Sequence, residues 1–490
     1  MVADSTDGTT GGTMSGSSSG TTAVVDSSSS GTPCIPGEEG CTCLEEEMCE
    51  GELTCLEDVC TLVLCGNGEI DEGEECDDEN RIDMDGCNND CTVSGGAAQV
   101  QAGYEHVCAL FHDGDIKCWG NHDAGRLGYL EVGQDIGDDE TPADMPFVNV
   151  GAPVVQLSLG SDFTCALLAT EEVVCWGNGQ HGRLGQGNQA DLGTDEEPAS
   201  ITPISLGGTP IEISAGDQHA CAVMLNGDLR CWGRNDRGQL GLPGIDMVGD
   251  DELPSDVAPV NVGAGVAVDH VAAGGDHTCA ILSGGDVLCF GRDNLGQLGT
   301  ALVAEDIGDN EDPGTSTIVS LDQQAIVISA RFNHTCVNYV GGSMQCWGAG
   351  GSGQLGYGTL DDIGDDEEVD SLGPITFAMA ASGIGLGEDH TCVHIGTTQI
   401  YCWGEGDNGR LGYGNTMDIT EPLPMQVNVA LPLAPTMVSA GAEFTCGRTQ
   451  DSRAKCWGRN NRGQLGYGAA WDTDLGVMEP IDAIGEIPLE

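Results

Sequence analysis

A single sequence pattern recurs seven times between Cys108 and Cys456. Each copy has two cysteines separated by nine residues, then an aromatic residue and a glycine directly after the second cysteine. Gly-Arg/Gln-Leu-Gly begins seven residues after that cysteine. The first cysteines of successive copies lie 54 to 58 residues apart, a period typical of solenoids, propellers and arrays. The pattern therefore predicts one supersecondary unit per repeat.

Each repeat contains four short runs of alternating or β-branched residues, separated by Gly, Pro, Asn and Asp. In the third copy they are residues 203–206, 211–216, 219–225 and 228–233. Such runs predict strands joined by tight turns, and helical periodicity is absent. Seven four-stranded antiparallel sheets arranged radially bury their faces and leave only short edges. We therefore predict an all-β fold, a seven-bladed β-propeller over residues 97–490.

The cysteine spacing also predicts the register of one hairpin in each blade. A three-residue loop that ends in glycine, such as 225–227, places Cys221 opposite Cys231. Directly opposed residues can lie close enough for a cross-strand disulfide. We predict seven disulfides, each within one blade: Cys108–Cys118, Cys165–Cys175, Cys221–Cys231, Cys279–Cys289, Cys336–Cys346, Cys392–Cys402 and Cys446–Cys456.

The two ends of the repeat region suggest how the ring closes. A Pro-containing run such as 146–150 precedes each inner strand except the first, 100–103. The C-terminal run 487–489 has no strand after it. Because an open ring leaves unpaired edges, we expect these two segments to share one blade.

The repeats resemble those of the regulator-of-chromosome-condensation family. The resemblance rests on Ala273-Gly274, on His-Thr-Cys-Ala at 277–280, on Cys-Trp-Gly at 346–348 and on Gly-Gln-Leu-Gly at 353–356, and it covers about four fifths of the chain. It implies a seven-bladed propeller. It implies much less about activity, because function lies in sites added to a fold. The family includes a secreted propeller that inhibits β-lactamase, but none of its inhibitor residues can be mapped here.

The residues before the repeats divide into three parts. Residues 1–33 are mostly Ser, Thr and Gly, a composition typical of a disordered linker. Residues 34–64 hold six cysteines, and residues 65–96 hold four in a pattern that resembles a short cysteine-rich repeat of secreted bacterial proteins. We expect disulfides in both modules, with the connectivity left open. Zinc is less favoured, because this part has no Cys-x-x-Cys pair and no histidine.

The cysteine content indicates an oxidising compartment. The chain has 24 cysteines, a number typical of secreted rather than cytosolic proteins. We expect an extracellular or bacterial cell-surface protein, with the signal peptide not part of this chain. No apolar run is long enough for a membrane-spanning helix. The linker at 1–33 also favours the hypothesis of a lipid-anchored precursor.

The charge balance limits the partners. Eighty acidic residues against 15 basic ones give a formal net charge of −65. Such a surface repels phosphate backbones and anionic membranes. We therefore expect no nucleic-acid partner and no chromatin role.

Acidic residues recur after the Gly-x-Leu-Gly turn. Calcium prefers about six to eight oxygen ligands, which clustered carboxylates and carbonyls supply. The same residues also suit a solvated acidic rim with turn-forming Asp and Gly, and both interpretations stay open. The candidate calcium ligands are Asp135, Asp138, Asp139, Asp250, Asp251, Asp306, Asp309, Asp365 and Asp366, and, in a second cluster, Asp77, Asp78, Asp83 and Asp85.

Histidine stands two residues before the first cysteine in five repeats, and phenylalanine in the other two. Five equivalent copies indicate a structural duty, which we expect to be a ring nitrogen bonded to turn backbone. The recurring tryptophans are expected to pack between blades. The histidines are His106, His219, His277, His334 and His390.

Departures from the repeat are the candidate binding residues. Arg331 replaces the glycine that ends the inner strand in the other six copies, so its side chain is expected in the central channel or at its rim. Arg459 and Arg462 belong to a basic group in the last repeat, which either neutralises acidic loops or marks a docking face. Trp471 lies outside every repeat position and is a candidate aromatic anchor.

Motifs for catalysis are missing from the sequence, so we predict no enzyme and no catalytic residue. The preferred function is a non-enzymatic binding scaffold that recognises a protein or glycan through one propeller face. One alternative is a calcium-organised structural or matrix protein. The other is a carbohydrate-active lyase or hydrolase. No cofactor is expected apart from calcium.

Overall fold

The computed structural model describes residues 96–130, 133–301, 305–396, 399–422, 435–471, 473–478 and 481–489, together with residues 54–56 and 59–61. The chain divides into two compact units, Met1–Glu79 and Asn80–Glu490. In the first unit β1 (Thr54–Leu56) pairs with β2 (Val59–Thr61), and Cys55 lies opposite Cys60. The predicted linker, the rest of the cysteine-rich modules and the acidic cluster at 77–85 lie outside the described residues.

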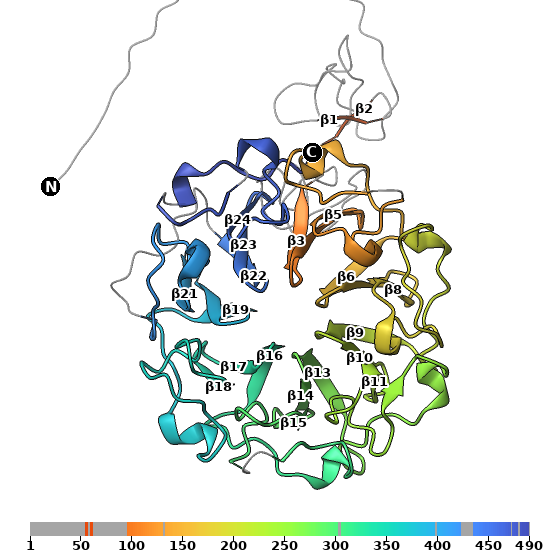
Figure 1. The fold of residues 1–490 in the computed structure, drawn as a ribbon, viewed down its shortest axis with the longest axis vertical. Helices are drawn as coiled ribbons and strands as arrows, with labels where there is room; N and C mark the ends of the chain where they lie inside the picture. Colours follow the sequence, from red (N-terminus) through yellow and green to blue (C-terminus); the bar gives the residue numbers. More distant parts are fainter. Residues whose placement is uncertain are drawn as a thin grey trace, which may run out of the picture. The chain divides into compact units, whose positions relative to one another are not determined.

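The second unit contains seven antiparallel sheets, the blades, arranged around a common centre with the first strand of each innermost (Figure 1). Blade 1 consists of β3 (Ala97–Ala102), β4 (His106–Phe111) and β5 (Ile116–Gly120), blade 2 of β6 (Val154–Leu159), β7 (Phe163–Leu168) and β8 (Val173–Gly177), and blade 3 of β9 (Pro210–Ala215), β10 (His219–Met224), β11 (Leu229–Arg234) and β12 (Met247–Val248). Blade 4 consists of β13 (Val268–Ala273), β14 (His277–Leu282) and β15 (Val287–Gly291), and blade 5 of β16 (Ala325–Arg331), β17 (His334–Tyr339) and β18 (Met344–Gly348). Blade 6 consists of β19 (Ala381–Leu386), β20 (His390–Ile395) and β21 (Gln399–Gly404), and blade 7 of β22 (Pro435–Ala440), β23 (Phe444–Thr449) and β24 (Ala454–Gly458).

Short 3₁₀ turns lie between the strands. They are η1 (Asp123–Gly125), η2 (Pro142–Asp144), η3 (Gln180–Gly182), η4 (Pro198–Ser200), η5 (Pro254–Asp256), η6 (Pro313–Thr315), η7 (Val369–Leu372), η8 (Asp407–Gly409), η9 (Gly468–Ala470) and η10 (Ile481–Ala483). No helix in the described part of the chain is long and apolar enough to cross a membrane.

The predicted hairpin register is confirmed. In blade 3 the loop 225–227 ends in Gly227 at a φ of +84°, and Cys221 lies directly opposite Cys231. All seven predicted pairs are disulfide-bonded, with Cα atoms 4.0 to 4.1 Å apart. Each bond therefore closes one hairpin within one blade.

The outer part of each blade is less regular than the inner three strands. The Pro-containing run lies along the third strand with few backbone bonds, as where Val148 N donates to Ile116 O at 2.9 Å. The one fourth strand among the described blades, β12 of blade 3, belongs to the acidic loop and not to the Pro-containing run. Proline has no N–H to donate, which limits how far such a run can continue a ladder.

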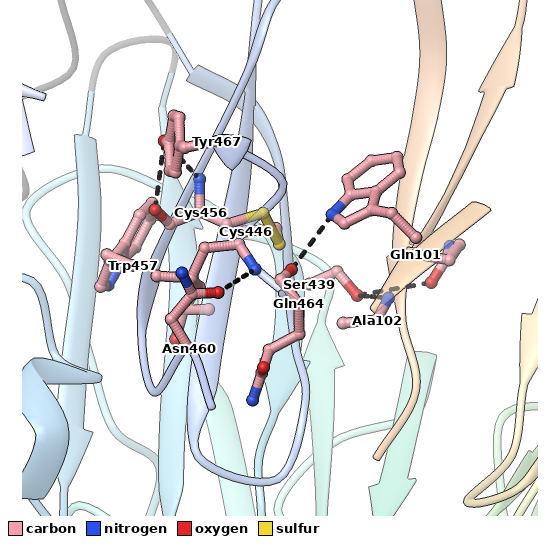
Figure 2. Close-up of a disulfide and its surroundings, with 12 residues drawn as sticks. Gln101, Ala102, Ser439, Cys446, Cys456, Trp457, Asn460, Gln464 and Tyr467 are labelled. Atoms are coloured by element: carbon pink, nitrogen blue, oxygen red, sulfur yellow. Dashed lines mark hydrogen bonds between the residues drawn. A yellow bond between two sulfur atoms is a disulfide. The ribbon is translucent and has the colours of Figure 1, made fainter. Parts of the chain in front are cut away.

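The chain ends do not share a blade as expected. Ile487 N donates to Ala454 O at 3.0 Å, so the C-terminal run forms the outer edge of blade 7. It pairs with the strand before it, as the run at 146–150 does, and each blade is therefore one continuous stretch of chain. Blades 7 and 1 meet through contacts such as Ala102 N to Ser439 Oγ at 3.0 Å (Figure 2).

Candidate functional site

The repeated tryptophans join neighbouring blades. The indole N–H of each donates at 2.8 to 3.1 Å to a carbonyl in the preceding blade, at the variable residue of Gly-x-Leu-Gly. Trp232, for example, donates to Arg183 O. Trp119 donates to Gln464 O and so joins blade 1 to blade 7. All six of these indoles are fully buried, and the expected packing role is confirmed.

The five repeated histidines also join blades. Each is fully buried, and its Nε2 lies 2.8 to 3.0 Å from a threonine hydroxyl in the following blade. The structural duty is confirmed, but the expected partner, turn backbone, was wrong. The pairs are His106–Thr164, His219–Thr278, His277–Thr335, His334–Thr391 and His390–Thr445.

The hydrogen bonds fix the tautomer of these rings. Thr278 Oγ1 donates to Gln239 O at 2.8 Å, so it can only accept from His219 Nε2–H. The Nδ1 atom of His219 then carries no hydrogen and has no partner. Burial lowers the pKa of His219 to about 3, and burial does the same to His277 and His334. These imidazoles are therefore neutral in the folded protein.

The two blades without this histidine are each followed by a blade without the threonine. Phe163 replaces histidine in blade 2, and the following blade has Ala220 in place of threonine. Phe444 replaces histidine in blade 7, and blade 1 has Val107. Histidine thus occurs only where the next blade supplies a hydroxyl. This signal is present in the sequence, and our reading of the sequence missed it.

The glycine that ends each inner strand is required by close packing. A Cβ added to Gly216 would lie 2.2 Å from Gly274 O and 2.7 Å from His219 Cε1. The equivalent glycines of the other regular blades face their own His or Phe ring in the same way. In blade 5 the residue is Arg331, and the next residue, Phe332, has a φ of +46°. The loop of blade 5 therefore departs from the repeat.

Arg331 lies in the central channel. Its Nη1 donates to Leu159 O, a residue of blade 2, at 2.7 Å. Its guanidinium carbon lies 5.4 Å from the Phe332 ring, and Phe332 meets Tyr104 of blade 1 edge-on at 5.7 Å. Blade 5 thus reaches blades 1 and 2 with two consecutive side chains.

One face of the propeller carries most of the basic residues. The third strand of each blade ends beside the loop that follows the inner strand, as where Asn121 N donates to Glu105 O at 2.9 Å. These loops and the Gly-x-Leu-Gly turns form the face where the inner strands end, which we call the arginine face. It holds eight of the 15 basic residues of the chain: Arg126, Arg183, Arg234, Arg237, Arg292, Arg410, Arg459 and Arg462.

All eight arginines of this face are paired with acids. Arg126 lies 2.9 Å from Asp162, and Arg410 lies 3.3 Å from Glu443. Both guanidinium groups are buried, whereas those of blades 3, 4 and 7 are partly exposed. The predicted candidate Arg459 pairs with Glu443, and Arg462 lies 3.1 Å from Asp135. These ion pairs therefore neutralise the acidic loops of this face.

A groove opens on the arginine face between blades 3 and 4. Its volume is about 630 Å³. It is lined by two arginines, two asparagines and four acids: Arg237, Arg292, Asn294, Asn310, Glu305, Asp306, Asp309 and Glu311. Neither arginine was among the candidate binding residues that the sequence suggested. Trp471, the predicted aromatic anchor, is partly buried against the core of the last and first blades.

The predicted acidic loops lie at blade boundaries. In blade 1, Gly137 at a φ of +99° packs on the Gly463 turn of blade 7, which explains the glycine in this motif. Carboxylate oxygens come within 4.8 Å of one another in three loops. Burial and the neighbouring aspartates raise the pKa of Glu140 and Glu367 to about 7. The clustered residues are Asp138, Asp139 and Glu140; Asp250, Asp251 and Glu252; and Asp365, Asp366 and Glu367. Asp306 instead pairs with Arg237 at 3.5 Å.

The radial sheets and the interlocked Gly-x-Leu-Gly turns define a seven-bladed propeller of condensation-regulator type. The family model for the RCC1-like domain matches residues 67–383. Models of the regulator of chromosome condensation (RCC1) repeat match residues 399–447 and 438–464. The chain therefore belongs to the RCC1 repeat family.

Two relatives show different extents of similarity. The ultraviolet-B receptor UVR8 of Arabidopsis thaliana is 33% identical over 381 residues, which cover 77% of this chain and 80% of that protein. The probable E3 ubiquitin-protein ligase HERC3 of Homo sapiens is 32% identical over 221 residues, 44% of this chain. The match spans only 20% of HERC3, so the comparison concerns its RCC1-like region.

Solved structures show the same fold. Human WBSCR16 superposes with a TM-score of 0.57 at 20% identity, covering 72% of this chain and 86% of that one. Prp20p from Saccharomyces cerevisiae gives a TM-score of 0.57 at 19% identity, covering 79% and 87%. At these identities the likeness concerns the fold alone.

Proposed function

We propose that the protein is a non-enzymatic scaffold that binds a protein partner through the arginine face. The observation that carries this proposal is the concentration of eight arginines, five of them partly exposed, on one face of a chain with a net charge of −65. Arginine and aromatic residues are enriched at protein interfaces, and lysine is depleted. Prp20p, which shares the fold, is described by its binding to Gsp1p and histones. That description supports a binding role for the fold and identifies no partner here.

The groove between blades 3 and 4 is the proposed centre of contact. The side chain of Arg237 is 46% exposed and that of Arg292 is 34% exposed, so both can contact a partner. Each guanidinium is also held near an acid, Asp306 at 3.5 Å or Asp276 at 3.3 Å. A partner with both charge signs on its surface would match this groove.

The test compares two variants in capture from native surface extracts, followed by affinity measurement with the purified partner. Arg237→Ala/Arg292→Ala should weaken binding about tenfold or more, since interface arginines often contribute over about 1.4 kcal/mol. Arg453→Ala is the matched control. Arg453 is equally exposed and ion-paired, but it lies in the β23–β24 hairpin away from this face. Equal affinity of wild type and double variant would refute the proposal, as would a glycan captured in place of a protein.

We further propose that the protein works outside the cell or at a bacterial cell surface. The seven disulfides of the propeller support this, because such bonds persist in oxidising compartments. A membrane-impermeant amine label applied to intact cells should modify the protein. Labelling only after lysis, or free thiols in the native protein, would contradict this placement. Mass analysis of the native N-terminus tests the lipid anchor.

A calcium-organised structural role is the second candidate. The crowded carboxylates around Glu140 and Glu367, with pKa values near 7, would be relieved by a divalent cation. Calorimetric titration of the chelator-treated protein with calcium should then show binding and a higher melting temperature. Glu140→Gln/Glu367→Gln should lose part of that heat. No heat and no change in melting would leave these loops as a solvated acidic rim.

A further inference from the structure

The central channel contains a cavity of about 170 Å³ bounded by the inner strands. Its lining includes the polar side chains of Gln101, Ser158, Ser214 and Ser329. Arg331 is the one charged residue among the described lining residues. In so acidic a protein, a cavity without carboxylates and with one guanidinium is a distinct electrostatic environment.

The serine hydroxyls of this cavity have hydrogens left to donate. Ser158 Oγ accepts from Ala215 N at 2.8 Å, and Ser214 Oγ accepts from Ala273 N at 2.9 Å. These bonds use a lone pair of each hydroxyl and leave the O–H free. Donors without matching acceptors inside the fold favour a ligand that supplies acceptors.

Arg331 supplies the strongest unmatched donors. Its Nη1 is bonded to Leu159 O, but its Nε and Nη2 are enclosed and have no hydrogen-bond partner. These two atoms form one side of the guanidinium, the side that binds a carboxylate with two parallel hydrogen bonds. Burial lowers the pKa of Arg331 and the nearby carboxylate of Asp217 raises it, but no hydrogen bond or ion pair joins the two side chains in the described part of the chain. Asp217 accepts from Ser161 Oγ at 2.8 Å. A buried guanidinium edge without an acceptor is unfavourable.

We propose that the central channel is a binding site for a carboxylate, held by Arg331 and by the hydroxyls of Ser158 and Ser214. Arg331 lines the cavity, but its Nε and Nη2 atoms are enclosed, so the side chain has to rotate toward the channel for this edge to reach a ligand. A planar monoanion suits one guanidinium and neutral hydroxyl donors better than a phosphate dianion does. The carboxylate belongs either to a small molecule or to the end of a peptide chain. This proposal is independent of the proposed binding function of the arginine face.

The test measures binding and thermal stability of the full chain at constant ionic strength. Succinate and acetate should raise the melting temperature of the wild type, whereas equal concentrations of sulfate or phosphate should raise it less. A tetra-alanine peptide with a free C-terminus, compared with its C-terminal amide, distinguishes the peptide source. Stabilisation by the free peptide alone assigns the site to a chain end, and stabilisation by succinate assigns it to a small molecule.

Arg331→Gly is the decisive variant, because glycine stands at this position in the other six blades and the fold tolerates it there. It should abolish the carboxylate-dependent rise in melting temperature. Arg331→Lys should keep less than about a tenth of the affinity, since lysine keeps the charge but loses the two-pronged geometry. Arg453→Ala should behave as wild type. An undiminished response in Arg331→Gly, a preference for sulfate or phosphate, or no response in the wild type would each overturn the proposal.

Discussion

The buried histidines predict a specific dependence of stability on pH. The pKa of His219 is about 3 in the folded protein, against about 6.5 in an unfolded chain. Between these values the unfolded state binds a proton that the folded state excludes. Stability is therefore fully present above pH 6.5 and is lost as the pH falls from 6.5 toward 3. At pH 4.5 the loss from one such histidine is two pH units, about 2.7 kcal/mol.

A variant that copies a natural blade boundary isolates this effect. His219→Phe/Thr278→Ala reproduces at blades 3 and 4 the pair that Phe163 and Ala220 form at blades 2 and 3. The difference in unfolding free energy between pH 7 and pH 4.5 should shrink by about 2.7 kcal/mol relative to wild type. The other titrating groups, including Glu140, are common to both proteins and cancel in the comparison.

The assay is denaturant unfolding at pH 7.0, 5.5 and 4.5 under non-reducing conditions. At pH 5.5 the expected difference is about 1.4 kcal/mol, one unit below the unfolded pKa. Thr278→Ala alone is the control. It leaves His219 buried without its acceptor, so it should lower stability at every pH and keep the wild-type slope. Parallel profiles of wild type and double variant would show that these histidines do not resist protonation, and the reasoning would fail.

Three other perturbations test separate parts of the fold. Removing one disulfide by Cys221→Ala/Cys231→Ala should lower the unfolding free energy by about 2–3 kcal/mol, measured by denaturant titration. Trp232→Phe should lower it by only about 1 kcal/mol, because it removes one hydrogen bond and Phe290 fills the equivalent place in blade 4; a loss as large as that of Trp232→Ala, about 3–5 kcal/mol, would contradict this. Deleting residues 481–490 should lower the melting temperature sharply, because buried apolar side chains and a backbone bond to blade 7 are lost. An unchanged melting temperature in calorimetry would show that the C-terminal run is not part of blade 7.

The cysteine spacing predicted the hairpin register because it depends on local chain geometry alone. A three-residue loop leaves one way to oppose Cys221 and Cys231, and the structure has it. The position of the C-terminal run could not be predicted in this way. Whether 487–489 joins the first blade or the last depends on where each blade begins, and the repeat pattern is the same for both divisions.

The site was predictable only in part. The pairing of histidine with threonine was readable, since Phe163 and Ala220 depart from the pattern together. The ion pairs of the arginine face were not, because they join turns whose approach is set by the ring. Arg126 meets Asp162 across a blade boundary, and no local spacing indicates that contact. The channel position of Arg331 was suggested by the missing glycine, but its contact with Leu159 required the structure.

The positions of the disulfides and of the histidines together determine how this propeller should fail. Every disulfide of the propeller closes a hairpin with a sequence separation of 10, so none joins one blade to the next. The boundaries instead depend on packing and on hydrogen bonds such as Trp232 to Arg183 O and His219 to Thr278. Of these two kinds of hydrogen bond, protonation breaks only those of the histidines, and acid also protonates the carboxylates of boundary ion pairs such as Arg126–Asp162. Acid should therefore separate the blades while each hairpin keeps its disulfide. Reduction of the disulfides at neutral pH should instead destabilise single blades.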